Sequence, residues 1–158
     1  MRILGIDPGI GRTGWGVIDT QGSKIKAIGF GCIETEPNSE VGGRLFALHD
    51  EITNLIKEYK PQTVSIEELF FNKNVKTAFV VGQARGVILL AAAQHSLPVG
   101  IYTPPQVKMS LTGYGRAEKN QVGHMVKTIL HLEKVPKPDD TADALAIALT
   151  HAFSKKFA

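Results

Sequence analysis

At residues 2–9 the sequence reads RILGIDPG, which predicts a buried strand that ends at Asp7 and a tight turn at Pro8-Gly9. A second strand is expected over residues 13–19. Gln21-Gly22 then forms a turn, and a third strand covers about residues 24–35. Three consecutive strands joined by tight turns form an antiparallel meander, so the chain starts as a sheet.

The remainder of the chain alternates helices with two further strands. A helix is expected from about residue 37 to 59, ended by Pro61, and a strand over 63–66 follows it. Later helices are expected over about 75–95, 104–111, 118–132 and 140–153, with a strand at 99–102. This order predicts an α/β fold with a five-stranded mixed sheet, three antiparallel strands and then two parallel ones, and helices on both faces.

Length and composition indicate one globular domain over residues 1–158 in a reducing compartment. The 158 residues are 43% hydrophobic and 21% charged, and Cys32 is the single cysteine, so an internal disulfide is excluded. No export signal precedes Asp7, and the apolar stretch 78–93 is interrupted by Gln83 and Arg85, short of a membrane span. We therefore expect a cytoplasmic protein without a membrane segment.

The net charge of +3 is unevenly distributed along the chain. Residues 1–69 hold 7 basic and 10 acidic side chains, residues 70–138 hold 9 and 2, and residues 139–158 hold 2 and 3. A basic middle between acidic ends favours a polyanionic partner bound over one face. Scattered, solvated lysines would give the same charge, so this observation alone is not decisive.

Acidic residues stand where the predicted strands end. Asp7 directly follows the first strand, and Glu67 directly follows the fourth. Asp140 and Asp143 are three residues apart at the start of the last helix and share one of its faces. If strands one and four are neighbours, Asp7 and Glu67 emerge side by side, because functional groups collect past strand ends in α/β sheets.

Four carboxylates that close repel one another unless a cation neutralises them. Carboxylate oxygens with open coordination positions suit Mg²⁺ or Mn²⁺. Two such ions form the usual arrangement for phosphodiester hydrolysis, in which one activates water and the other stabilises the leaving 3′ oxygen.

Each acidic group also has an ordinary structural explanation. Asp7-Pro8-Gly9 can be a simple turn, Glu67-Glu68 a solvated strand end, and Asp140 with Asp143 a helix-capping arrangement. Asp139 also precedes the helix and competes with Asp140 as a ligand. The conjunction of three such groups in a chain with a basic middle favours a functional site.

Several motifs, taken in order, resemble those of the RuvC Holliday-junction resolvase family and cover nearly the whole chain. They are GIDPG at residues 5–9, TGWG at 13–16, IEELF at 66–70, GQARG at 82–86, AEKNQV at 117–122 and DTADALA at 140–146. The resemblance implies a ribonuclease H-like fold and a homodimer that nicks four-way DNA junctions symmetrically in recombination and repair. The implied products are 5′-phosphate and 3′-hydroxyl ends. It also implies cooperation with a RuvA–RuvB branch-migration complex.

The resemblance also implies roles for particular residues. The four acidic positions of the family fall on Asp7, Glu67, Asp140 and Asp143, which would hold Mg²⁺ as two ions, with Mn²⁺ as a substitute. The DNA-binding positions, together with weaker basic candidates, are Phe70, Phe71, Lys73, Arg85, Lys108, Arg116 and Lys119. The helix at 75–95 is apolar nearly all round, and Gly82 and Gly86 would allow a second subunit to approach closely.

Three other functions share part of this pattern. An actin-like or sugar-kinase ATPase also has Asp-x-Gly before a hairpin, but it needs two such lobes, and 158 residues are too few. An RNA–DNA hybrid nuclease would share the fold without the dimer helix. A junction-binding module without activity would be expected to lack at least one of the carboxylates.

Overall fold

The computed structural model describes residues 1–68 and 74–156. Its centre is one five-stranded sheet in the order β3-β2-β1-β4-β5. β1, β2 and β3 pair antiparallel, and β4 and β5 run parallel to β1, as the sequence predicts. The strand bounds are β1 Arg2–Asp7, β2 Arg12–Gln21, β3 Lys24–Glu34, β4 Thr63–Glu67 and β5 Val99–Tyr102.

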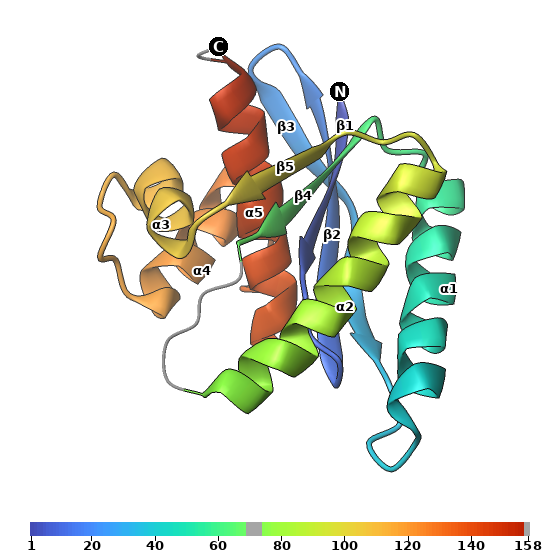
Figure 1. Cartoon of the computed structure of the whole chain (residues 1–158). Coiled ribbons are helices and arrows are strands. Elements are labelled where there is room, and N and C mark those ends of the chain that lie inside the picture. Colours follow the sequence, from blue (N-terminus) through green and yellow to red (C-terminus); the bar gives the residue numbers. More distant parts are fainter. Residues whose placement is uncertain (69–73, 157–158) are drawn as a thin grey trace.

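Helices cover both faces of this sheet, which confirms the predicted layers. Figure 1 shows α1 and α2 together on one face and α5 along the other, with α3 and α4 beside α5. The bounds are α1 Val41–Tyr59, α2 Val75–Gln94, α3 Pro104–Thr112, α4 Lys119–Ile129 and α5 Asp139–Lys156.

Three predicted helix bounds are wrong, one of them the end of α5, which lies at Lys156 rather than at about residue 153. α1 begins at Val41 rather than near residue 37, because residues 37–40 form a turn before the helix. α4 ends at Ile129 rather than at 132, since His131 adopts a left-handed conformation with φ 53°. The predicted end of α1 is confirmed: Lys60 is left-handed and its N–H bonds to the Ile56 carbonyl, just before Pro61.

α2 is 20 residues long and apolar enough to span a membrane by length and composition, contrary to the expectation from residues 78–93. The helix extends beyond that stretch at its start. Its inner face packs on the sheet through Ala84, Ile88 and Ala91, all fully or almost fully buried. This packing is that of a helix on a globular core.

The sheet separates two hydrophobic clusters. One joins the sheet to α1 and α2 through residues such as Leu4, Ile66 and Ile88, and the other joins it to α3, α4 and α5 through residues such as Ile3 and Leu145. α5 lies very close to the sheet because Gly5 has no side chain. A Cβ at this position would overlap the Ala144 carbonyl oxygen. This close contact fixes the position of the acidic start of α5.

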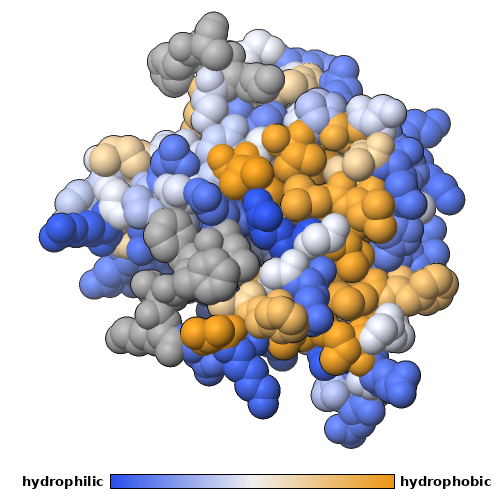
Figure 2. All heavy atoms as spheres, in the orientation of Figure 1, coloured by the Kyte–Doolittle hydropathy of each residue, from blue (hydrophilic) through white to orange (hydrophobic). Residues whose placement is uncertain are grey.

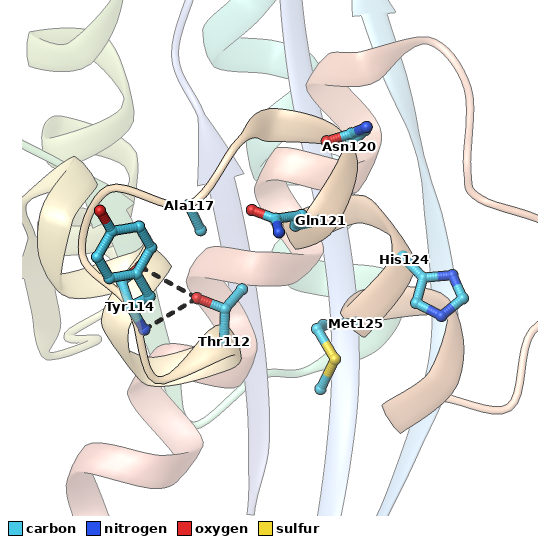
Figure 3. Close-up of a pocket in the computed structure, with 7 residues that line it drawn as sticks. All are labelled: Thr112, Tyr114, Ala117, Asn120, Gln121, His124 and Met125. Atoms are coloured by element: carbon cyan, nitrogen blue, oxygen red, sulfur yellow. Dashed lines mark hydrogen bonds between the residues drawn. The ribbon is translucent and has the colours of Figure 1, made fainter.

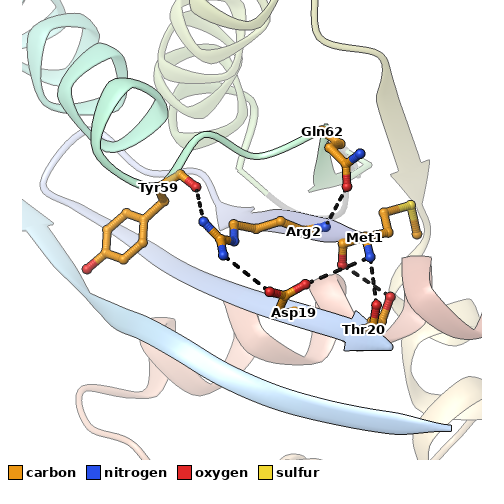
Figure 4. Close-up of polar contacts among 6 residues, drawn as sticks. All are labelled: Met1, Arg2, Asp19, Thr20, Tyr59 and Gln62. Atoms are coloured by element: carbon orange, nitrogen blue, oxygen red, sulfur yellow. Dashed lines mark hydrogen bonds and ion pairs between the residues drawn. The ribbon is translucent and has the colours of Figure 1, made fainter. Parts of the chain in front are cut away.

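A polar network holds the start of β1 (Figure 4). The Arg2 guanidinium donates a 2.7 Å bond to the Tyr59 carbonyl at the end of α1 and lies 3.2 Å from Asp19 on β2. The backbone N–H of Arg2 also bonds to the side chain of Gln62, just before β4. Arg2 thus connects three elements at the end of β1 opposite Asp7.

Candidate active site

The sheet brings Asp7 and Glu67 together. β1 and β4 are parallel neighbours, with Ile6 paired with Ile66 at the end of the register. The next residue in each strand is acidic, so the two carboxylates leave the same edge side by side. The condition on which the prediction depended, that strands one and four be adjacent, is confirmed.

α5 adds Asp140 and Asp143 to this edge. The backbone of Asp140 lies against Gly14 of β2, where a Cβ would overlap its carbonyl oxygen. The charges of Asp143, Glu67 and Asp140 all act on Asp7. Four acidic side chains from β1, β4 and α5 therefore converge on one place.

The pKa values of these carboxyl groups reflect the electrostatic cost of this arrangement. Burial, followed by the charges of Asp143, Glu67 and Asp140, raises the pKa of Asp7 to about 8. Burial and the charge of Asp143 raise the pKa of Glu67 as well. Burial also raises the pKa of Asp143, although a hydrogen bond from Lys119 opposes the shift. Without a cation, the site holds protons more tightly than isolated carboxyls do.

Asp139 has a different environment from Asp140. Its carboxylate is 2.7 Å from the Lys137 Nζ and 4.0 Å from the Lys119 Nζ. The hydrogen bond from Lys137 and the lysine charges hold the pKa of Asp139 below its usual value. The charge of Asp140 acts on Asp7, and the backbone of Asp140 lies against Gly14 of β2, so we favour Asp140 as the fourth acid.

Lys108 and Lys119 border the acidic site, as expected. Both line a hollow of about 190 Å³ together with Glu67 and Asp143. The Lys119 Nζ lies 3.0 Å from Asp143, and the charge of Lys108 acts to lower the pKa of Glu67. These two lysines place positive charge where a phosphate would approach the acids.

Arg85 of α2 lies on the other side of the carboxylates. It lines a hollow of about 210 Å³ with Asp7, Pro8, Glu67 and Glu68. Its Nε is buried and finds no hydrogen-bond partner within the described part of the chain. A buried guanidinium nitrogen without a partner is costly, and a phosphate oxygen would satisfy it.

Of the remaining predicted DNA-binding residues, only Arg116 lies in the described part of the chain. Phe70, Phe71 and Lys73 lie outside the described residues. Arg116 is exposed in the loop between α3 and α4 and lines none of the hollows that hold Lys108, Lys119 or Arg85.

The donor chemistry of the site fits a hard divalent cation. Four carboxylates gather there, and burial followed by the neighbouring acidic charges raises the pKa of Asp7 and of Glu67, so a divalent cation would offset the buried negative charge. The ammonium of Lys119 is the cation that now contacts Asp143. In the described ranges 1–68 and 74–156, no three acidic, histidine or cysteine side chains lie close enough together to hold one metal ion.

Metal-free protein should lose stability as the pH rises from about 4 to 8. Because the folded pKa of Asp7 is raised, its protonated form stabilises the fold at low pH, and this contribution disappears as the pH passes about 8. Thermal melting in EDTA should show Tm falling by roughly 5 °C or more over this range. Millimolar Mg²⁺ should largely remove the fall.

Asp7→Asn is the control for this titration, since it cannot ionise. Its Tm in EDTA should change much less with pH than that of the wild type. An equal pH dependence in both proteins would show that the titration of Asp7 does not cause the loss of stability.

A larger hollow lies elsewhere in the described part of the chain (Figure 3). It has a volume of about 630 Å³ and is lined by residues of α4 and the preceding loop, with Tyr114 on one side and Gln121 and Met125 facing it. It contains no acidic residue, so it is separate from the carboxylate site.

The structure adds one residue that sequence reasoning missed. Lys137 follows Val135-Pro136, a segment interpreted only as a rigid linker, and it lies in a hollow shared with Lys119 and Asp143. The available signal was a lysine between two prolines, just before the adjacent acids Asp139 and Asp140.

Comparisons with known proteins agree with this geometry. The family profile described as crossover junction endodeoxyribonuclease RuvC matches residues 3–151. A protein of that name from Brevibacillus brevis is 54% identical over 157 residues, covering 99% of this chain and 95% of its own. Another from Desulforamulus reducens is 54% identical, covering 96% and 93%.

Solved structures show the same likeness. Thermus thermophilus RuvC has a TM-score of 0.93 at 39% identity, covering 99% of this chain and 96% of its own. The same protein in complex with a Holliday junction substrate gives 0.94 at 39% identity and the same coverage. The yeast mitochondrial Holliday junction resolvase Ydc2, at 16% identity and a TM-score of 0.67, shares the fold. The expected ribonuclease H-like fold is confirmed, and the chain belongs to the crossover junction endodeoxyribonuclease RuvC family.

Proposed function

We propose that this protein resolves four-way DNA junctions by hydrolysing one phosphodiester in each of two strands of like polarity. The observation that carries the proposal is the convergence of Asp7, Glu67, Asp140 and Asp143 beside Lys108 and Lys119. The Holliday junction bound to the related Thermus protein supports the choice of substrate.

The four carboxylates would hold Mg²⁺, as two ions, with Mn²⁺ as a substitute. Bound there, the ions would activate the attacking water and stabilise the leaving 3′ oxygen. The water oxygen bonds to phosphorus, the bond to the 3′ oxygen breaks, and that oxygen takes up a proton. The products are a 5′-phosphate and a 3′-hydroxyl.

The protein's own side chains position the DNA for this step. Lys119 and Lys108 face the phosphate from α4 and α3, and Arg85 approaches from α2. Phe70, Phe71, Lys73 and Arg116 remain proposed contacts with DNA. When phosphate and metal enter, Lys119 would exchange its contact with Asp143 for one with the substrate.

We infer a homodimer, because a two-fold symmetric junction is cut at two places by two identical sites. α2 presents an uncovered apolar face, with Phe79 67% and Leu90 53% exposed. Figure 2 shows apolar side chains gathered over this part of the molecule, and Phe46 of α1 is also exposed. A patch of this kind marks an interaction site.

Phe79→Asp should separate the dimer. Each interface would carry the change twice, and a buried aromatic replaced by a charge typically costs about 2–4 kcal/mol at an interface. Sedimentation at micromolar concentration should show monomer, and nicks in the two strands should become uncoupled. Met109→Asp, at an exposed apolar residue of α3, should remain dimeric; monomeric wild-type protein would contradict the inference.

The wider assignment follows the same family. We propose that residues 1–158 act as one nuclease domain in the cytoplasm, in recombination and repair. We also propose that the domain works with a RuvA–RuvB branch-migration complex.

The test is incubation with a labelled four-way junction, a linear duplex and an RNA–DNA hybrid, each with and without Mg²⁺. Paired, metal-dependent nicks in the junction alone are expected. Cleavage of the hybrid instead would indicate an RNA–DNA hybrid nuclease, and junction binding without cleavage would indicate a binding module.

A further inference from the structure

A second hollow adjoins the acidic site between α4 and the start of α5. It has a volume of about 480 Å³, and its polar lining consists of Lys119, Asn120, Lys137, Asp139 and Asp143. We call it the lysine pocket. Lys119 and Asp143 also line the hollow beside Glu67, so the lysine pocket and the acidic site share a wall.

Asp139 stands between the two lysines of this pocket. Its two carboxylate oxygens face different ammonium groups, Oδ1 at 2.7 Å from Lys137 and Oδ2 at 4.0 Å from Lys119. An anion flanked by two lysines is also the arrangement that a DNA phosphate would adopt here.

These ion pairs are open to solvent. The Asp139 side chain is 55% exposed and that of Lys137 is 73% exposed. Exposed ion pairs are weak and are easily exchanged for another partner. A phosphodiester can therefore displace the Asp139 carboxylate without breaking buried structure.

We propose that the lysine pocket binds the backbone phosphate next to the one that is cleaved, and that Asp139 occupies this phosphate position in the free protein. This inference rests on the proposed function, since it places a neighbouring phosphate of the same strand. Lys137 and Asn120 contact that phosphate, and Lys119 lies between it and the scissile one.

Asp139 then lowers DNA affinity in a defined way. In the free protein it neutralises two lysines, and in the complex its charge repels the incoming phosphate. The affinity that these contacts provide falls as the salt concentration rises, because each lysine–phosphate contact releases a counterion from DNA.

The experiment measures binding of the full-length protein to a labelled four-way junction in EDTA over a range of salt concentrations. Lys137→Ala should weaken binding about 3–10-fold at low salt and reduce the slope of log K against log salt by about 0.9, one phosphate contact. Asp139→Asn should strengthen binding by a similar factor. In the Lys137→Ala background, Asp139→Asn should have a smaller effect.

The same segment offers matched controls. Lys134 and Glu133 are exposed and do not line the lysine pocket. Lys134→Ala and Glu133→Gln make the same charge changes, so they report what net charge alone does.

The inference is overturned if Lys137→Ala matches Lys134→Ala, or if Asp139→Asn matches Glu133→Gln, while the wild type prefers the junction. Wild-type protein that prefers linear duplex would instead contradict the proposed function, and the same comparisons could then be made on duplex. Absence of any DNA binding would overturn both.

Discussion

Asp7→Asn should abolish junction cleavage, by on the order of 10³-fold or more, while leaving junction binding intact. Asp7 is the acid on which the charges of Asp143, Glu67 and Asp140 all act, so it stands at the centre of the cluster. Asparagine keeps nearly the same shape but removes the negative charge that a divalent cation needs. The measurement is single-turnover cleavage of a labelled junction with Mg²⁺.

We do not expect unfolding to cause this loss of cleavage. Burial, followed by the charges of its acidic neighbours, disfavours the ionised form of Asp7 in the folded protein. Asn cannot ionise, so the variant should melt at the same temperature or higher in EDTA. Junction affinity in EDTA should be equal to that of the wild type or tighter.

Asp50→Asn is the matched control, because Asp50 is an exposed acid on α1 and makes the same charge change. It should cleave like the wild type. Asp7→Asn with more than a tenth of normal activity would show that Asp7 is not needed to hold a metal, and the proposed mechanism would be wrong.

Gly14→Ala should greatly reduce cleavage although no acid is touched. A methyl group at Gly14 would overlap the Asp140 carbonyl oxygen, and backbone on both sides leaves no flexible side chain to move away. The first turn of α5 must shift, and Asp140 and Asp143 shift with it. Displacement of catalytic groups by about 1 Å costs on the order of 10²-fold in rate.

The same substitution should destabilise the fold, by about 1–3 kcal/mol, because it overpacks a helix–sheet contact. Urea denaturation and single-turnover cleavage measured on the same sample separate the two effects. Cleavage should remain low under conditions where the variant is fully folded.

Gly43→Ala serves as its control. Gly43 lies in α1, and nothing stands within 4 Å of a Cβ placed there. Alanine at this helical position should be neutral or stabilise by up to about 1 kcal/mol, with normal activity. If Gly14→Ala behaved in the same way, the close contact between β2 and α5 would have no role in placing the acids.

The element order and the strand-end acids could be read from the sequence. Alternation and turn residues predicted the meander, and the apolar stripe with Pro61 predicted the end of α1. Local signals suffice for such features, since they depend on neighbours a few residues apart. The start of α1 was misplaced because Pro37-Asn38-Ser39 suits a turn as well as a helix start.

Which acid joins the site depended on the packing of α5. Most of the helix from Ala142 to Ala152 is buried, so its sequence has no clear polar stripe to show which side faces the sheet. Gly5, Gly14 and Gly16 receive the helix and set its rotation, and that rotation separates Asp140 from Asp139.

By itself, the sequence determined the sheet, its helical layers and the acids at Asp7 and Glu67, because strand periodicity and strand ends are local properties. Only the tertiary structure decided that Asp139 pairs with Lys137, that Arg85 lies beside Asp7, and that α2 leaves an apolar face open. Arg85 and Asp7 are far apart in the chain, and only packing brings them together. Lys137 and Asp139 are two residues apart, but the contact of Asp139 with Lys119 joins the start of α5 to α4. These relations depend on how α5 and α2 pack, which no short stretch of sequence specifies.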